Sequence, residues 1–338
     1  MKNLRKYSDW TVSSVRCTSG KVAIIVPVYN AGIYLKKCLD SILRQKYEEI
    51  VLIVVNDGSN DCTCEILSEY QKTDNRILII NQMNKGLPFA RNAGLAAAEK
   101  IGDIKYIAFV DADDFVDEDF IGIHIENLVK HRADVSVCGY FIFNNDGKLN
   151  NAERGGGGPI LTQQDYLQMV FRYRKWKTIN GAGGSVWKQV YKLSVIRGIR
   201  FPEDRELVED EAFCVKVSKL AKRYVYIHQN LYYYRLTTGS LAKQEKFLRR
   251  LMDGRKLCWA LSDGLPRDLR LLIFCSYLKV RLDLIKKGEI INDLRLYTGL
   301  VAESCGRGII DFRTLKRFLL LCFIPGLAGR MCISRNEK

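Results

Sequence analysis

The stretch YIAFVDADD at residues 106–114 decides the fold of the first half of this chain. Five apolar residues between polar neighbours are typical of a buried strand in a parallel sheet, and the run is too short for a helix. We expect the carboxylates of the following Asp111, Asp113 and Asp114 to point out of the carboxyl edge of that sheet, where open α/β sheets bind ligands. Alternate residues of an extended segment point the same way, so Asp111 and Asp113 can reach one divalent cation. A solvated acidic turn is the alternative interpretation.

Ahead of this motif, strands and helices alternate and are joined by short connections. Apolar runs typical of strands lie at 22–26, 50–55 and 76–80, and apolar residues recur at helical spacing at 34–43, 63–70 and 88–100. The order βαβαβαβ predicts an α/β fold with a Rossmann-like, doubly wound, mostly parallel sheet. Three strands end in polar segments, PVYN (27–30), NDGS (56–59) and DADD (111–114), which should converge on one crevice.

The order and spacing of these motifs resemble family 2 glycosyltransferases of the GT-A fold, of the type that builds bacterial surface polysaccharides. The motifs are VAIIVPVYNAGIYLKKCLDSIL (22–43), IVVNDGSND (53–61), GLPFARNAGL (86–95), FVDADD (109–114), VEDEAF (208–213) and YYYR (232–235). The resemblance covers residues 20–240. It implies an inverting, metal-dependent enzyme that transfers a hexosyl or N-acetylhexosaminyl group from a UDP-sugar to a saccharide or lipid-linked acceptor.

The resemblance also implies which residues bind the donor. Asp111 and Asp113 would hold Mn²⁺ or Mg²⁺ on the diphosphate, Asp57 would accept a hydrogen bond from uracil, and Tyr29 would stack on the base. The full set implied for nucleotide-sugar binding is Pro27, Tyr29, Asn30, Asp57, Arg91, Asp111, Ala112 and Arg235.

For four of these residues the sequence equally allows a structural role. Tyr29 is alternatively a core residue at a strand end, and Asp57 a turn residue before Gly58. Arg91 lies in the first turn of a predicted helix, where the macrodipole disfavours a cation, so it could form a salt bridge to Asp57 or DADD. Arg235 could neutralise phosphate charge or be solvated at the end of its strand.

A second acidic station follows at Glu209-Asp210-Glu211, at the start of an apolar-periodic helix. Inverting transfer needs one carboxylate to take the proton from the acceptor hydroxyl while the metal stabilises the departing diphosphate. The resemblance favours Asp210 as this base, with Glu209 as the next choice. Locally, acids at this position could instead cap the helix or offset its dipole.

Length and composition indicate the domain organisation and the cellular compartment. The 338 residues are enough for a large core. The resemblance implies a GT-A catalytic domain at 20–240 with a donor and metal half (20–130) and an acceptor half (160–240). The glycine-rich stretch 144–159 should link the halves. Eleven cysteines without CxxC pairs and a polar, basic N-terminus favour a reducing, cytoplasmic location.

The net charge of +15 is concentrated near the C-terminus, where residues 241–338 hold 20 Lys and Arg against 10 Asp and Glu. Segments 271–284 and 315–327 mix apolar residues with these cations. The run at 318–329 is too short to span a bilayer and contains Pro325. We expect a helical, basic C-terminal extension that contacts the inner, anionic face of the membrane, or else a helical bundle packed on the catalytic domain.

Other classes of function fit the sequence less well. No nucleic acid is expected as a partner, because recognition-helix, zinc-finger and RNP-like patterns are absent and an acidic crevice repels phosphate. A nucleotidyltransferase acting on sugar phosphates is the alternative enzyme, but it would usually carry a glycine-rich phosphate loop after its first strand. His124 and His228 have no partners at metal-ligand spacing and should be structural.

Overall fold

The computed structural model describes residues 20–143, 149–151, 160–171, 184–204, 208–236, 247–286, 297–307, 309 and 318. The N-terminal segment 1–19, most of the expected link at 144–159 and the apolar run beyond Phe318 lie outside these residues. Within them, no helix has the length and apolar character needed to cross a membrane.

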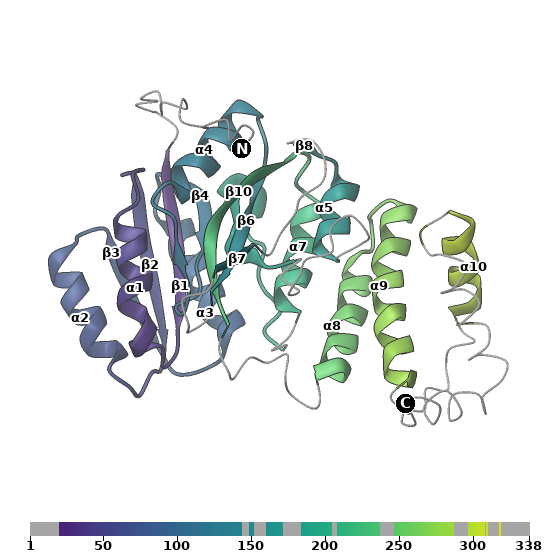
Figure 1. The fold of residues 1–338 in the computed structure, drawn as a ribbon, viewed down its shortest axis with the longest axis horizontal. Coiled ribbons are helices and arrows are strands. Elements are labelled where there is room, and N and C mark those ends of the chain that lie inside the picture. The colour runs from purple at the N-terminus through teal and green to yellow at the C-terminus, as the bar shows by residue number, and fades with distance from the viewer. Residues whose placement is uncertain are drawn as a thin grey trace, which may run out of the picture.

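The N-terminal half forms the alternating fold that the sequence predicts (Figure 1). Its strands are β1 (Lys21–Val28), β2 (Ile50–Asp57), β3 (Ile77–Gln82) and β4 (Ile104–Phe109). Its helices are α1 (Gly32–Leu43), α2 (Thr63–Thr73) and α3 (Leu87–Lys100). The strands pair in parallel in the order β3-β2-β1-β4. The prediction of a mostly parallel α/β sheet is therefore confirmed.

The second half of the chain extends the same sheet instead of building a separate one. From β4 the order continues as β9-β6-β10-β5, where β6 and β10 are parallel while β9 and β5 run antiparallel to their neighbours. These strands are β5 (Phe115–Val116), β6 (Val135–Phe143), β9 (Gln189–Lys192) and β10 (Tyr224–Arg235), with β7 (Leu149–Asn151) and β8 (Ile160–Leu161) beside them. Part of the expected link, 149–151, is thus a short strand paired with β6.

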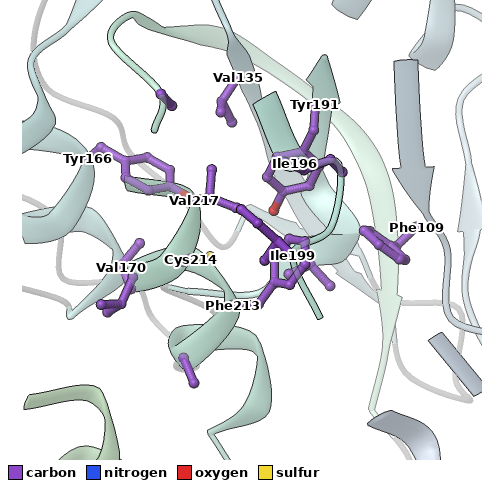
Figure 2. Packing of buried hydrophobic residues seen from close by; sticks show 14 of the residues in the cluster. Phe109, Val135, Tyr166, Val170, Tyr191, Ile196, Ile199, Phe213, Cys214 and Val217 are labelled. Atoms are coloured by element: carbon purple, nitrogen blue, oxygen red, sulfur yellow. The ribbon is translucent and has the colours of Figure 1, made fainter. Parts of the chain in front are cut away.

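Helices cover both faces of the sheet and bury a hydrophobic core on each. One core packs the sheet against α1, α2 and α4 (Phe120–Lys130). The other packs it against α3, α5 (Gln163–Val170) and α7 (Glu209–Ser218), with the short α6 (Leu193–Ile196) alongside. In the second core Phe109 meets Tyr191, Phe201 and Phe213 edge to face. Figure 2 shows Phe109, Tyr191 and Phe213 in this core. This aromatic packing fixes the residue from which the DADD segment emerges.

Two glycines allow close approaches that shape the crevice. Gly58, with φ +74°, turns the chain after β2, and a Cβ there would lie 2.7 Å from the backbone nitrogen of Asn84. A Cβ on Gly94 would lie 2.4 Å from Ile25, so glycine lets α3 rest directly on β1. The start of α3, which carries Arg91, is thereby held close to the sheet.

The C-terminal helices are α8 (Phe247–Leu261), α9 (Arg267–Lys286) and α10 (Thr298–Gly306), at the end of the molecule opposite α2 (Figure 1). Residues from α8, α9 and the turn between them belong to the same buried core as α7: Cys258, Leu265, Leu269, Leu272 and Ile273. For segment 271–284 the second of our two expectations therefore holds: it is a helix packed on the catalytic domain. The division of the chain at 240 stays a prediction.

Candidate active site

The polar ends of β1 and β2 meet, as their sequence motifs predict. The backbone N–H of Asn30 donates to Ser59 Oγ at 3.0 Å, and Asn30 Oδ1 accepts from the N–H of Asn60 at 2.8 Å. Asp61 Oδ2 accepts from the N–H of Gly32 at the start of α1. The PVYN and NDGS segments therefore form one connected rim at the carboxyl edge of the sheet.

Tyr29 and Pro27 differ in exposure on this rim. Pro27 is buried at the end of β1, whereas the Tyr29 side chain is 50% exposed. The alternative that placed Tyr29 in the core is therefore wrong. Its ring lies open to solvent, as stacking on a base would require.

Asp57 is only 3% exposed, and protein donors already surround it. Its carboxylate accepts hydrogen bonds from Gln82 Nε2 at 2.7 Å and from the N–H groups of Lys85 and Gly86 at 3.0 and 2.8 Å. Asp57 thus ties β2 to the loop before α3. Its role towards a uracil ring stays a prediction.

The carboxylates of the three aspartates after β4 do not all point the same way. Asp114 is 1% exposed and accepts hydrogen bonds from the Tyr232 hydroxyl and the Arg235 N–H, both at 2.7 Å. The same Tyr232 oxygen accepts from the N–H of Asp111 at 3.1 Å. Our expectation that all three carboxylates point out of the edge is therefore corrected, because Asp114 turns inward and anchors the segment.

Asp111 and Asp113 remain as candidate metal ligands, with the buried Ala112 between them. Burial and the nearby Asp111 raise the pKa of Asp113 to about 6. Among the described residues no cluster of three or more metal-binding side chains exists. Two carboxylates nevertheless suit Mg²⁺ or a similar ion, because such ions complete their coordination with substrate phosphates and water.

Arg91 joins the two acidic stations. Its side chain is 1% exposed, and its guanidinium contacts Asp111 at 2.9 Å, Glu209 at 3.1 Å and Asp210 at 2.5 Å. These three carboxylates outweigh burial and raise the pKa of Arg91. Of the alternatives for Arg91, the salt bridge to DADD is formed and the one to Asp57 is not. Contact of this residue with a nucleotide stays a prediction.

Glu209 and Asp210, at the start of α7, face this arginine, and neither caps the helix through its side chain. Asp210 Oδ2 accepts from the N–H of Val186, which opens a short 3₁₀ turn (Val186–Lys188) before β9. Val208, the residue before the helix, has φ +69°, a strained value for a β-branched side chain. This backbone turn directs Glu209 and Asp210 towards Arg91, and no sequence pattern predicts the turn.

The two candidate bases differ in their electrostatics. Burial and then the neighbouring Asp210 raise the pKa of Glu209. Burial also raises the pKa of Asp210, but there the next largest effect is Arg91, which lowers it. Asp210 is therefore the acid at which Arg91 is the largest effect after burial. Its side chain is also the more accessible, at 18% against 11% for Glu209.

Arg235 is not solvated at the end of its strand, so that alternative is wrong. It is 9% exposed, its Nε donates to the carbonyl of Asp113 at 2.8 Å, and its guanidinium lies 4.5 Å from the Tyr34 ring. This places a cation directly beside the candidate metal edge. Neutralisation of a donor phosphate by Arg235 stays a prediction.

Glu211, to which the sequence assigned no role, connects the site with the C-terminal helices. Its carboxylate forms a two-pronged ion pair with Arg255 of α8, at 2.7 Å to Nη2 and 2.6 Å to Nε. Both side chains are 7% exposed, and the Arg255 guanidinium also lies over Phe171. No sequence signal paired these two residues.

Comparison with known proteins agrees with this geometry. The family model for Glycosyl transferase family 2 matches residues 23–192. GlyA, a glycosyltransferase of Streptococcus pneumoniae, is 33% identical over 78% of this chain and 38% of its own length. GgaB, a minor teichoic acid biosynthesis protein of Bacillus subtilis, is 29% identical over 66% of this chain and 24% of its own length.

A crystal structure of Staphylococcus aureus TarS (residues 1–349) with UDP-GlcNAc superposes with a TM-score of 0.65 at 18% identity, covering 93% of this chain and 88% of TarS. The fold is thus the GT-A fold. The chain belongs to glycosyl transferase family 2. Membership favours glycosyl transfer over the nucleotidyl transfer left open by the sequence. The matched region spans well under half of GlyA and of GgaB, which are longer proteins.

Replacement of Arg255 by Met should destabilise the fold by roughly 3–5 kcal/mol, because it leaves Glu211 buried without its guanidinium partner. Urea unfolding measures this change. The double variant Arg255→Met/Glu211→Gln should recover part of the loss, and Arg267→Met, in an exposed pair with Glu303, should have little effect. If Arg255→Met unfolds like the wild type, the ion pair does not hold α8 against α7.

Proposed function

We propose that this enzyme moves a sugar from a UDP-sugar to a saccharide or lipid-linked oligosaccharide acceptor, with inversion at the anomeric carbon. The observation that supports this proposal most is the position of Arg91. One buried guanidinium contacts both Asp111, at the candidate metal edge, and Asp210, the candidate base. The candidate metal edge can therefore act on the leaving group while Asp210 acts on the attacking hydroxyl, from two sides of one crevice.

On the donor side, Asp111 and Asp113 would hold Mn²⁺ or Mg²⁺ at the diphosphate. The bound ion would offset the negative charge that grows on the departing UDP. Tyr29 would stack on the base and Asp57 would orient the uracil from the NDGS rim, with Pro27, Asn30 and Ala112 shaping the pocket. Arg235 would add a second positive charge beside the diphosphate.

On the acceptor side, Asp210 would take the proton from the acceptor hydroxyl as its oxygen attacks the anomeric carbon. Arg91 supports this role, since it favours the ionised form of Asp210. The hydrogen bond from Val186 fixes the orientation of the carboxylate. Glu209, whose pKa is raised by burial and by Asp210, is the weaker candidate.

Replacement of Asp113 by Ala should lower UDP release from the sugar donor by about 10²-fold or more, because a metal ion supplies several kcal/mol to such a transition state. Donor binding should also lose its dependence on Mn²⁺. Asp103→Ala, at an exposed acid paired with Lys21, serves as the matched control and should keep full activity. Full turnover of the wild type in excess EDTA would contradict the metal assignment.

Replacement of Asp210 by Asn should lower kcat by about 10²–10⁴-fold, the usual contribution of a general base, while UDP and Mn²⁺ still bind. Single-turnover kinetics and UDP titration separate the two effects. Glu209→Gln, which changes the adjacent carboxylate in the same way, should cost less. If Glu209→Gln shows the large loss and Asp210→Asn does not, the two roles are exchanged.

We further propose that the enzyme works at the cytoplasmic face of a cell membrane, in the synthesis of a surface polysaccharide. The similarity to GgaB supports the class of product, and the basic C-terminal region supports contact with anionic lipid. Each basic residue near such a surface adds about 1 kcal/mol of attraction. Since segment 271–284 is packed into the protein, this contact would depend on the region after α10.

Deletion of residues 315–338 should weaken binding of the full chain to phosphatidylglycerol vesicles, because it removes basic residues next to the apolar run. Vesicle sedimentation measures the change, with neutral phosphatidylcholine vesicles as the control. High salt should reproduce part of the effect by screening. Equal binding to both lipids, or none, would contradict membrane contact through this region.

A further inference from the structure

Asn92, the residue after Arg91 on α3, binds a backbone segment that precedes α7. Its side-chain amide pairs with both backbone groups of Phe201: Nδ2 donates to the Phe201 carbonyl at 3.0 Å, and Oδ1 accepts from the Phe201 N–H at 2.8 Å. Nδ2 also donates to Glu203 Oε1 at 3.0 Å. Asn92 is only 6% exposed. The polar atoms of this buried amide therefore hold the segment at 201–203 against α3.

The Phe201 ring connects this attachment with the parts of the active site. It is 1% exposed and stacks on Phe213 of α7, with ring centres 4.2 Å apart. It also meets Phe109, the last residue of β4, at 5.4 Å, and the Arg91 guanidinium lies 5.3 Å from its ring centre. One ring therefore contacts the strand before DADD, the arginine between the acidic stations, and the helix that carries Asp210.

The start of α7 is thus held by two consecutive residues of α3. Arg91 holds it by charge, through Asp210. Asn92 holds it by packing, through Phe201, whose ring lies on Phe213. Phe213 and Asp210 are neighbours on the helix surface, because they are three residues apart. A shift of the Phe201 ring would therefore move Asp210 even while Arg91 stayed in place.

The same segment has a second attachment to α3, farther from the site. Glu99, about two turns beyond Asn92, accepts from the Gly198 N–H at 2.9 Å and from Arg200 Nη1 and Nη2 at 2.9 and 2.6 Å. The Arg200 carbonyl in turn accepts from Lys216, in the last turn of α7, at 2.7 Å. This attachment therefore supports the far end of α7 and not its first turn.

We propose that Asn92 is a positioning residue for the base: through Phe201 it keeps Asp210 in the orientation from which it takes the acceptor proton. This inference rests on the proposed function, which makes Asp210 the base. Loss of Asn92 should slow the chemical step and leave donor binding intact, because the PVYN and NDGS rim lies at the ends of β1 and β2.

The amide of Val186 measures the position of Asp210 without an assay of activity. Its N–H donates to Asp210 Oδ2 at 3.1 Å, and Val186 is fully buried. Hydrogen exchange of this amide, followed by NMR on the full chain without ligands, should be about tenfold faster in Asn92→Ala, because Asp210 leaves its acceptor position more often. Glu99→Gln, the matched control, should lower stability to urea but leave this exchange rate unchanged.

Unchanged Val186 exchange in Asn92→Ala, or equal acceleration in Asn92→Ala and Glu99→Gln, would overturn the proposal. If Asn92→Ala does not fold, Asn92→Asp takes its place in every measurement. It keeps the oxygen that accepts from the Phe201 N–H and removes the donor to the Phe201 carbonyl.

The second measurement is the release of UDP from UDP-GlcNAc, UDP-glucose and UDP-galactose in the presence of Mn²⁺. With the donor that the wild type uses, Asn92→Ala should lower kcat by about 10- to 100-fold, since a misplacement of about 1 Å can cost that much. KM for the donor should not change. Glu99→Gln should keep both constants. A raised KM at full kcat in Asn92→Ala would assign the residue to donor binding and overturn the proposal.

Asp210→Asn in the same assay separates this inference from the proposed function. If Asp210→Asn keeps full kcat, the base assignment fails, whatever the Val186 exchange shows. If Asp210→Asn is inactive while Asn92→Ala changes neither kcat nor the exchange, the base assignment stands and the positioning role fails. A wild type that releases UDP from none of the three sugars would count against the UDP-sugar donor, and the Val186 exchange would still decide whether Asn92 positions Asp210.

Discussion

The ion cluster around Arg91 is the interaction on which the rest of the active site depends. A guanidinium that is 1% exposed is costly to bury unless hydrogen-bonded carboxylates surround it. Asp111, Glu209 and Asp210 supply them from two segments about a hundred residues apart in sequence. The cluster therefore fixes the position of the DADD edge relative to the start of α7.

The charge balance of this cluster explains its chemistry. Burial raises the pKa of both Glu209 and Asp210, and the Arg91 guanidinium opposes this rise at each of them. Asp111 is paired with Arg91, whereas burial and the nearby Asp111 raise the pKa of Asp113. A protein with a net charge of +15 thus keeps an acidic centre, and its spare cations lie at the border of that centre and towards the C-terminus.

The helices after β10 belong to the structural support of the site. Residues of α8 and α9 share the core of α7, and Arg255 holds Glu211 one residue away from Asp210. A helix start with a left-handed residue such as Val208 needs firm packing behind it, because the strain would otherwise relax. The packing of α8 against α7 supplies that support.

The sequence by itself determined the sheet and the place of the crevice. Strands buried on both faces are continuous apolar runs, and the carboxyl ends of parallel strands meet at one edge. The strand at 106–114 and the strands before it could therefore be predicted from local sequence alone. Only the tertiary structure decided which polar side chains meet. Asp114 turns inward to Tyr232, and Arg91 joins Asp111 to Asp210. Arg255 pairs with Glu211. Each of these contacts joins segments that are distant in sequence. Such contacts depend on side-chain direction and burial, which periodicity does not encode.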